Sequence, residues 1–236
     1  MSVYIHGGLR SPIGVLNGQY KHMRPEMLGA QLIDELINRH SILQVDGLFC
    51  GNAVGTGGNI GRLMGLMCNL PNSVPAITVD MQCASALMSI EIAYAHIVSG
   101  IMDSAIAGGI ESSSLQPERV YASGDDRKGT YKVAQFTPQD QSPLAMLEGA
   151  ERTIHKHNVT KEDLYLHIIG SHQRASAALD NPYLQSYIMP ITIDGKRCID
   201  ECIRPTMNEK LLSRMKPLLG ADSITNAGNA CLTHDG

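Results

Sequence analysis

Residues 79–87 read Val79-Asp80-Met81-Gln82-Cys83-Ala84-Ser85-Ala86-Leu87. The apolar run at 74–79 leads into this stretch and predicts a β-strand, and the run at 84–98 leads out of it and predicts a helix. Residues 79–87 are therefore expected to form a strand-to-helix junction. The expected helix is apolar on nearly every side, so we expect it to be buried. Its apolar residues are Leu87, Ile90, Ile92, Ala93, Ala95 and Ile97.

Cys83 is the residue of this junction with the most distinctive chemistry. It lies at or near the helix N-terminus, where unsatisfied N–H groups and the helix dipole favour a thiolate. Such positions lower a cysteine pKa from about 8.5 to roughly 3.5–7.5, and a thiolate is a nucleophile that can carry an acyl group. Placement alone leaves an alternative, in which Cys83 is a free cysteine packed as a small hydrophobe.

Two motifs in this part of the chain resemble the N-terminal half of the thiolases. They are Gln82-Cys83-Ala84-Ser85-Ala86 and Ala107-Gly108-Gly109-Ile110-Glu111-Ser112. In that family the cysteine of the first motif is the acylated nucleophile, and the Gly-Gly-x-Glu-Ser segment ends the next strand. The resemblance implies that Cys83 is the nucleophile, although this chain has Ala84 and Ala86 where the family usually has glycine.

Composition limits the class of protein. The 236 residues are 43% hydrophobic and 18% charged, as in globular proteins, and their number suits one large domain or a domain with a substantial insertion. The net charge of −4 offers no electrostatic case for nucleic acid or an anionic membrane. No apolar run reaches about 18 residues and no signal-peptide pattern is visible, so we expect a cytoplasmic protein without a membrane span. The six cysteines indicate neither a disulfide framework nor a metal site.

Strand and helix patterns alternate along the first half of the chain. Strands are expected at 2–8, 45–51, 74–79 and 104–109, and helices at 25–39, 59–70 and 83–99. This order predicts an α/β fold, with a mixed, mostly parallel sheet flanked by helices. The glycine-rich loop at 55–61 departs from the dinucleotide spacing G-x-G-x-x-G, so a structural role is expected for it, with Asn59 and Arg62 matching a thiolase pattern.

The second half of the chain has a different pattern. Residues 112–136 are polar and predict a loop. Helices are expected at 142–157, from a capping box at Thr160 to residue 179, and at 210–219, with a break at Asn181-Pro182. The block resembles the mainly helical loop domain of thiolases, which covers the pantetheine tunnel. The expected division is a core at 1–112, an inserted loop domain at 113–220, and a return segment at 221–236.

Five residues match coenzyme A (CoA) contacts of the family. Arg204 matches an arginine beside the adenine, and an arginine both stacks on a base and donates to phosphate; the alternative is a solvated arginine in an acidic loop. Met146 follows Ala145, where biosynthetic thiolases tend to carry histidine. The end of the chain resembles the pantetheine-binding loop, which implies contacts from Ala227, Ala230 and Cys231. Cys231 replaces the serine of the family and is a poorer hydrogen-bond donor.

The resemblance implies the N-terminal half of an acyl-CoA acyltransferase, either an acetyl-CoA C-acetyltransferase or a 3-ketoacyl-CoA thiolase. Its substrates are acyl-CoA thioesters, and no separate cofactor or metal is implied. Thiolases place a Gly-His-Pro and a Cys-x-Gly segment in their second half, and neither occurs in this sequence. The implied partners are a C-terminal thiolase half, in the same chain or a separate one, and further copies in a homodimer or homotetramer.

Two other functions stay open at this point. The chain could be a non-catalytic CoA-binding or assembly module left by a split or truncated thiolase gene, which the absence of an accompanying second half would favour. It could also be a decarboxylating ketoacyl synthase, which shares the fold, although the loop domain and the Asn-Ala-Gly-Asn-Ala segment argue against this.

Overall fold

The computed structural model describes residues 2–55, 58–132, 135, 137–138 and 142–236, and these form two compact units. The first unit comprises Met1–Pro117, Ser186–Glu201 and Thr233–Gly236, and the second comprises Glu118–Gln185 and Cys202–Leu232. The division expected from the sequence, at 112 and 220, remains a prediction. It differs from these units mainly in two segments, because 186–201 belongs to the first unit and 221–232 belongs to the second.

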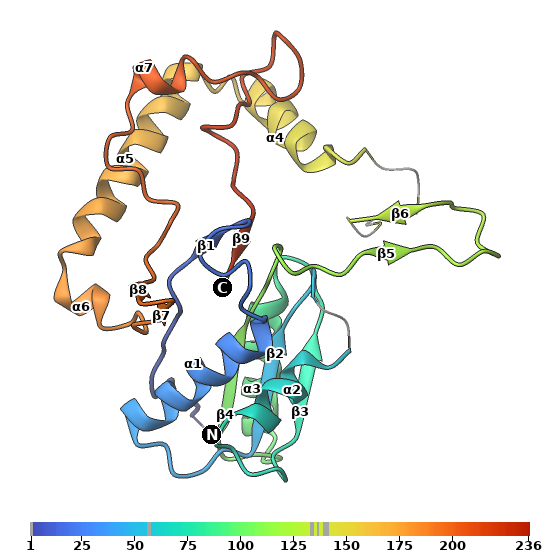
Figure 1. Ribbon diagram of the computed structural model, residues 1–236, viewed down its shortest axis with the longest axis vertical. Helices are drawn as coiled ribbons and strands as arrows, with labels where there is room; N and C mark the ends of the chain where they lie inside the picture. The colour runs from blue at the N-terminus through green and yellow to red at the C-terminus, as the bar shows by residue number, and fades with distance from the viewer. Residues whose placement is uncertain (1, 56–57, 133–134, 136, 139–141) are drawn as a thin grey trace. The chain divides into compact units, whose positions relative to one another are not determined.

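A parallel sheet of three strands, in the order β3-β2-β4, forms the centre of the first unit (Figure 1). The strands are β2 (Gly47–Gly51), β3 (Ala76–Val79) and β4 (Ala105–Gly109), and the helices beside them are α1 (Pro25–His40), α2 (Ile60–Met67) and α3 (Ser85–Val98). This confirms the α/β class and the order of these elements predicted from the sequence. Thr56 and Gly57, in the predicted glycine-rich loop, lie outside the described residues.

The side chains of β2 alternate between the two faces of the sheet, and their contacts show which helices cover each face. Every residue of β2 is buried, and successive side chains point to opposite faces of the sheet. Leu48 and Cys50 join the core cluster that includes Leu28 of α1 and Ile60 of α2. Phe49 points the other way, and its ring lies 5.2 Å from that of His96 in α3. Helices therefore cover both faces of the sheet.

The boundaries of α1 follow from local chemistry. Pro25 stands in the first turn, where its fixed φ suits a helix and its missing N–H is not needed. Glu26 in the first turn and Arg39 and His40 in the last turn have the charges that favour those ends of the helix dipole. The helix ends at His40, and the next residue, Ser41, has a left-handed φ of 49°.

The expected burial of α3 is wrong for one of its faces. Ser85, Ser89 and Ala93 are buried against the sheet. The opposite face is exposed, with exposed fractions of 68% for Leu87 and 55% for Tyr94. Apolar residues on all sides predict burial only if a second layer lies over the outer face, and the described residues supply none there.

The strand predicted at 2–8 does not form. Residues 2–9 belong to no strand, and Tyr4 and Ile5 are 84% and 91% exposed. Alternation alone does not make a strand, because the backbone groups need a neighbouring strand as hydrogen-bond partner. The first strand is instead β1 (Gly14–Val15), which pairs antiparallel with β9 (His234–Asp235).

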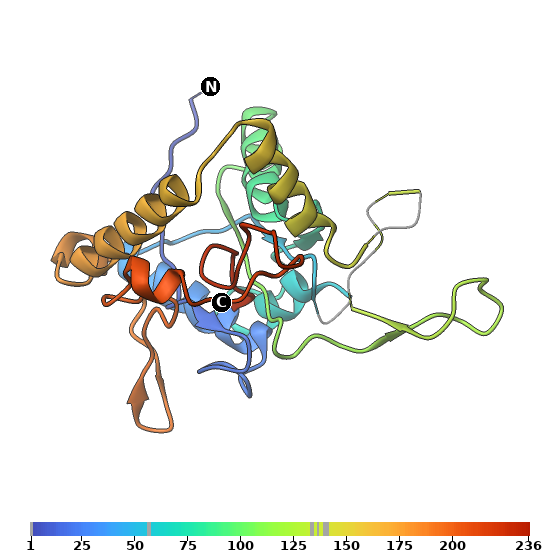
Figure 2. The same cartoon turned by 90° about the horizontal axis from the view of Figure 1, so that it is seen from above.

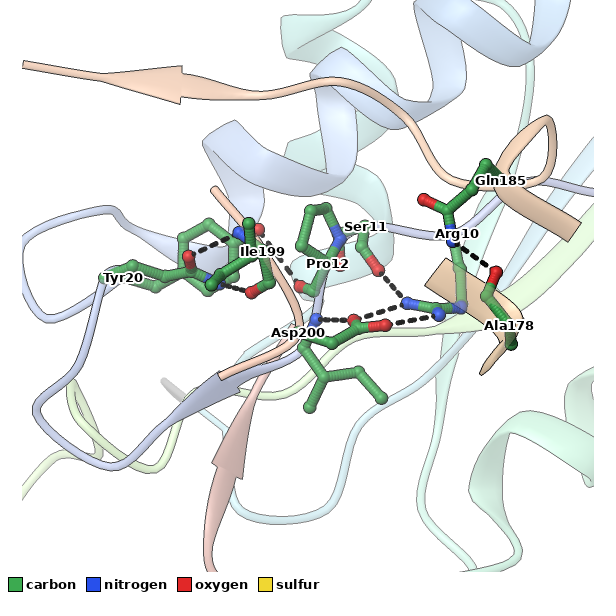
Figure 3. A network of polar contacts seen from close by, with 10 residues as sticks. Arg10, Ser11, Pro12, Tyr20, Ala178, Gln185, Ile199 and Asp200 are labelled. Atoms are coloured by element: carbon green, nitrogen blue, oxygen red, sulfur yellow. Dashed lines mark hydrogen bonds and ion pairs between the residues drawn. The ribbon is translucent and has the colours of Figure 1, made fainter. Parts of the chain in front are cut away.

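The segment 186–201 fastens residues 10–20 of the first unit. It includes the hairpin of β7 (Thr192–Ile193) and β8 (Lys196–Arg197). Figure 3 shows Arg10 donating two hydrogen bonds of 2.8 Å to the Asp200 carboxylate, which also accepts the Ile13 N–H. Burial alone would raise the pKa of Asp200, but these hydrogen bonds and the charge of Arg10 outweigh it and lower that pKa. Tyr20, 1% exposed, donates its hydroxyl hydrogen to the Pro12 carbonyl.

Helices dominate the second unit. They are α4 (Ala145–Lys156), α5 (Lys161–Leu179), α6 (Pro182–Gln185) and α7 (Glu209–Leu212). The capping box predicted at Thr160 is present, with Asp163 as its second member. The helix predicted at 210–219 ends at Leu212, and Pro217 disfavours helical backbone at the residue before it.

A hairpin occupies part of the predicted loop 112–136. It consists of β5 (Arg119–Val120) and β6 (Thr130–Tyr131). Tyr121 stacks on Tyr131 with ring centroids 4.5 Å apart, and the Arg127 guanidinium lies 4.4 Å from the Tyr121 centroid. The polar composition of this segment predicted a loop and gave no sign of the hairpin. The hairpin is stabilised by stacking between Tyr121 and Tyr131, which are ten positions apart. Residues 133, 134 and 136 of the predicted loop lie outside the described residues.

Candidate active site

Cys83 lies in the turn between β3 and α3. The first helical residue is Ser85, so Cys83 comes two positions before the helix, near the predicted place. Its side chain is exposed. The junction thus presents a thiol at the surface of the first unit, beyond the carboxyl end of a parallel strand, where open α/β sheets bind ligands.

The turn that presents Cys83 is unusual in its backbone. Gln82 has a φ of 53°, a left-handed conformation that is uncommon for residues other than glycine. Ser85 fastens the turn, because its Oγ donates to the Gln82 carbonyl at 2.5 Å and accepts the Met81 N–H at 2.8 Å. Such strained residues persist where the surrounding structure holds them, and they cluster at active sites.

Two glycines let the start of α3 approach the sheet. A Cβ on Gly51 would lie 2.3 Å from the backbone nitrogen of Ala86, and one on Gly109 would lie 2.8 Å from the Ala86 Cβ. Ser89, fully buried, adds a hydrogen bond of 2.8 Å from its Oγ to the Gly108 carbonyl. These contacts fix the helix that follows Cys83 against the ends of β2 and β4.

The other thiols of this unit differ from Cys83 in burial. Burial raises the pKa of Cys50 to about 12, and it also raises the pKa values of Cys68 and Cys198. A raised pKa keeps a thiol protonated and unreactive near neutral pH. Within the first unit, Cys83 is therefore the thiol with the access that a nucleophile needs.

Glu111 organises the loop after β2. Its carboxylate accepts the N–H groups of Ala53, Val54 and Gly55 and the side-chain amide of Asn52, at 2.8–3.0 Å. Glu111 also exchanges two backbone hydrogen bonds with Gly236. It thereby ties together the ends of β2, β4 and the last residues of the chain.

Asn59 and Arg62 support the structural role predicted for the glycine-rich loop. The Asn59 side chain accepts the Arg62 N–H as the N-cap of α2 and donates to the Ala76 carbonyl of β3. Arg62 donates to the carbonyls of Asn72 and Val74 at 2.8 and 2.7 Å. Both residues hold the approach to β3, and so to Cys83.

The five residues matched to CoA contacts all belong to the second unit. Ala227, Ala230 and Cys231 lie in one loop, with Ala227 and Cys231 exposed and Ala230 half-buried. The loop packs closely on α7, because a Cβ on Gly228 would lie 2.6 Å from a methyl group of the buried Leu212. Met146 is 72% exposed in the first turn of α4.

Arg204 is exposed, and its backbone N–H donates to His172 Nδ1 at 3.2 Å. Burial and the positive charge of Arg204 both lower the pKa of His172. A neutral His172 can accept this hydrogen bond at Nδ1, whereas a protonated one cannot. The segment that carries Arg204 is thereby fastened to α5, which leaves the guanidinium at the surface.

Sequence reasoning missed the roles of Glu111 and Glu151. Glu151 lies on α4, and its carboxylate accepts hydrogen bonds from residues 223–225. A glutamate two positions after the end of the apolar strand β4 was a usable signal for Glu111. Ala150-Glu151 matches the thiolase loop domain, but this match does not reveal the role of Glu151, because its hydrogen-bond partners at 223–225 lie more than 70 positions away.

None of the helices in the described part of the chain has the length and apolar character needed to cross a bilayer. All six cysteines are free thiols.

Known proteins match this chain over nearly its whole length. A protein of Staphylococcus haemolyticus with the provisional name acetyl-CoA C-acetyltransferase VraB is 33% identical over 236 residues, which cover 96% of this chain and 61% of the relative. The protein of the same name from Staphylococcus epidermidis is 32% identical with the same coverage. A crystal structure of the Bacillus anthracis acetyl-CoA acetyltransferase matches with a TM-score of 0.84 and 26% identity, over 98% of this chain and 62% of that one.

The chain thus spans about 61% of the length of these curated relatives. Residues 3–236 match the family described as thiolase, N-terminal domain. The chain therefore belongs to the thiolase family.

Proposed function

We propose that this chain is the N-terminal part of a thiolase-type acyltransferase in which Cys83 carries the acyl group. The observation that carries the proposal is the exposed Cys83 thiol on a strained strand-to-helix turn, held by Ser85. The provisional names of the relatives, acetyl-CoA C-acetyltransferase, support acetyl-CoA as the acyl donor.

A base of the C-terminal half takes the proton of the Cys83 thiol, and the sulfur attacks the thioester carbonyl of an acyl-CoA. The carbonyl oxygen takes up negative charge, which the Cys83 backbone N–H helps to stabilise. The bond between carbonyl carbon and CoA sulfur breaks, CoA leaves as a thiolate that takes up a proton, and the acyl group stays on Cys83. The α-carbon of a second acyl-CoA, after losing a proton, then attacks the acyl carbon and releases Cys83. Thiolysis of a 3-ketoacyl-CoA is the reverse sequence.

CoA binding is assigned to the second unit in this proposal. Arg204 offers a guanidinium to the nucleotide, Ala227, Ala230 and Cys231 contact pantetheine, and Met146 contacts the acyl end. The exposure of Arg204, Ala227, Cys231 and Met146 supports these roles, because a ligand can reach them. No metal or separate cofactor takes part.

The acid and base groups come from a C-terminal thiolase half in the same or a separate chain. The exposed apolar face of α3 supports this partner. Leu87, Ile90, Tyr94 and Val98 follow helical spacing and are 42–68% exposed. An apolar stripe of this kind is typical of a surface that a partner covers. The relatives, of which this chain covers about 61%, have additional length for such a half.

A second copy of the chain is assigned to the outer edge of β3, where the described residues supply no neighbouring strand. This strand pairs with β2 along one edge and stands at the end of the sheet order, and Ile77 is 47% exposed. An edge without a neighbouring strand is a template for pairing with another strand. At this edge the Ala76 carbonyl already accepts a hydrogen bond from the Asn59 side chain, which a partner strand would have to displace or bypass. We assign a homodimer, alone or within a homotetramer, and the cytoplasm as its location.

Limiting alkylation tests the assignment of Cys83. Iodoacetamide should label Cys83 faster than the five other cysteines, as followed by peptide mass mapping. Cys231 is the informative competitor, because it is also exposed but lies in a loop and not before a helix. The variant Cys231→Ala should leave the Cys83 rate unchanged. Labelling of the other cysteines while Cys83 stays unmodified would refute the nucleophile assignment.

A further inference from the structure

Glu151 makes a dense set of hydrogen bonds with a distant segment. Its carboxylate accepts the N–H groups of Ile224 and Thr225 at 2.8 and 2.9 Å. It also accepts the hydroxyls of Thr225 and Ser223, the latter at 3.1 Å. His155, one turn further along α4, places Nε2 at 3.3 Å from the same carboxylate.

The bonds fix a segment that is buried and directly precedes the loop assigned to pantetheine. Thr225 and Asn226 are each 3% exposed. Figures 1 and 2 show the segment after α7 returning to α4. There the Glu151 carboxylate accepts the Ile224 N–H. Burial alone would raise the pKa of Glu151, but the hydrogen bonds from Thr225, Ile224 and Ser223 outweigh it and lower that pKa to about 2. The carboxylate is therefore ionised near neutral pH.

Two asparagines extend this network of hydrogen bonds into the loop that follows. Asn226 Oδ1 accepts the Gly228 N–H at 2.8 Å, and Asn229 Oδ1 accepts the Asn226 N–H at 2.7 Å. Asn229 also donates to the Ile224 carbonyl at 2.9 Å. The turn at 226–229 is thus closed on itself, and its attachment to α4 runs through Glu151.

We propose that Glu151 is a positioning residue that holds the 223–231 loop in the conformation that binds the pantetheine arm of CoA. The proposal rests on the proposed function, which assigns Ala227, Ala230 and Cys231 to pantetheine. Ordering the loop before the ligand arrives removes part of the entropic cost of binding. Helix α4 carries both Glu151 and Met146, so one rigid element supports the loop and the residue assigned to the acyl end.

The test compares the wild-type chain with Glu151→Gln. The amide has one acceptor oxygen and presents N–H groups toward donors. Charge-assisted hydrogen bonds are roughly twice as strong as neutral ones, so we expect about tenfold weaker CoA binding by calorimetry. Hydrogen exchange of the Ile224 and Thr225 amides should become faster by a similar factor. Glu162→Gln is the matched control, because Glu162 is an exposed glutamate of α5 in the same unit.

Adenosine 3′,5′-bisphosphate, which lacks the pantetheine arm, separates positioning from general damage. Glu151→Gln should leave the affinity for the bisphosphate within about twofold of wild type, since this ligand has no pantetheine arm to contact the 223–231 loop. If Glu151→Gln does not fold, Ser223→Ala removes one of the bonds and should give a smaller loss of CoA affinity in the same direction.

Equal CoA affinity in wild type and Glu151→Gln, despite faster exchange, would overturn the role of Glu151 and leave the proposed function intact. Loss of bisphosphate affinity in parallel with CoA affinity would also overturn it, because the effect would then be general. A wild-type chain that binds the bisphosphate but shows no added affinity for CoA would refute the pantetheine assignment and the role of Glu151 together.

Discussion

Gly51→Ala should displace the start of α3 and so disturb Cys83. The added Cβ would lie 2.3 Å from the Ala86 nitrogen, 2.4 Å from the Ser85 carbonyl carbon and 2.7 Å from the Ala86 Cα. All three are backbone atoms, so no side-chain rotation relieves the contact. Gly51 is not among the residues with positive φ, so its backbone conformation itself accepts alanine. The penalty is therefore steric.

The expected loss of stability is about 2 kcal/mol. Overpacking a buried site costs about 1–3 kcal/mol, and contact with three backbone atoms places this site near the upper end. Replacing glycine reduces the freedom of the unfolded chain, which returns about 0.5–1 kcal/mol.

Urea denaturation with Gly65→Ala as matched control tests this estimate. A Cβ on Gly65, inside α2, would meet Leu48 at 3.4 Å and Ala76 at 3.9 Å, which are ordinary contacts. This variant should gain up to about 1 kcal/mol, because alanine favours a helix over glycine. The iodoacetamide rate at Cys83 should change in Gly51→Ala and stay constant in Gly65→Ala. If Gly51→Ala matches wild type in both stability and Cys83 labelling, the close approach of α3 to β2 is not what positions Cys83.

Four further results are expected. The chain alone should not consume acetoacetyl-CoA in the presence of CoA, because the acid and base groups of the proposed mechanism, each typically contributing 10²–10⁴-fold, are assigned to the other half; turnover that disappears in Cys83→Ala would contradict this. Ile77→Glu should shift the chain to a smaller species on a sizing column, and an unchanged elution volume would place the dimer interface elsewhere than β3. Glu111→Gln should cost roughly 1–3 kcal/mol in urea denaturation, since it leaves backbone N–H groups of residues 53–55 poorly paired, and wild-type stability would show that solvent replaces the carboxylate. The pKa of Glu151 is about 2 in the folded state against an ordinary 4.5, so its contribution to stability is complete above pH 4.5 and is lost as the pH falls toward 2. In acid unfolding, Glu151→Gln should therefore lose less stability than wild type between pH 4.5 and pH 2. Superimposable acid-unfolding curves for the two proteins would contradict this contribution of Glu151.

The α/β class and the position of Cys83 could be predicted from the sequence. Apolar runs of strand length alternate with helical periodicity around β2, β3 and β4, and such patterns depend on neighbouring residues alone. The capping box at Thr160 is a local signal of the same kind. The motif around Cys83 indicated the family, which the match over residues 3–236 shows.

Only the tertiary structure decided which apolar faces are covered and which distant groups meet. Periodicity shows that α3 is apolar on all sides, but whether Leu87 and Tyr94 are buried depends on what packs over them. Residues 2–8 alternate like a strand, yet a strand needs a partner backbone at the right distance. The contacts of the polar residue Glu151 also could not be predicted from local sequence. Its partners at 223–225 are distant in sequence, and only the path of the folded chain brings their N–H groups to its carboxylate.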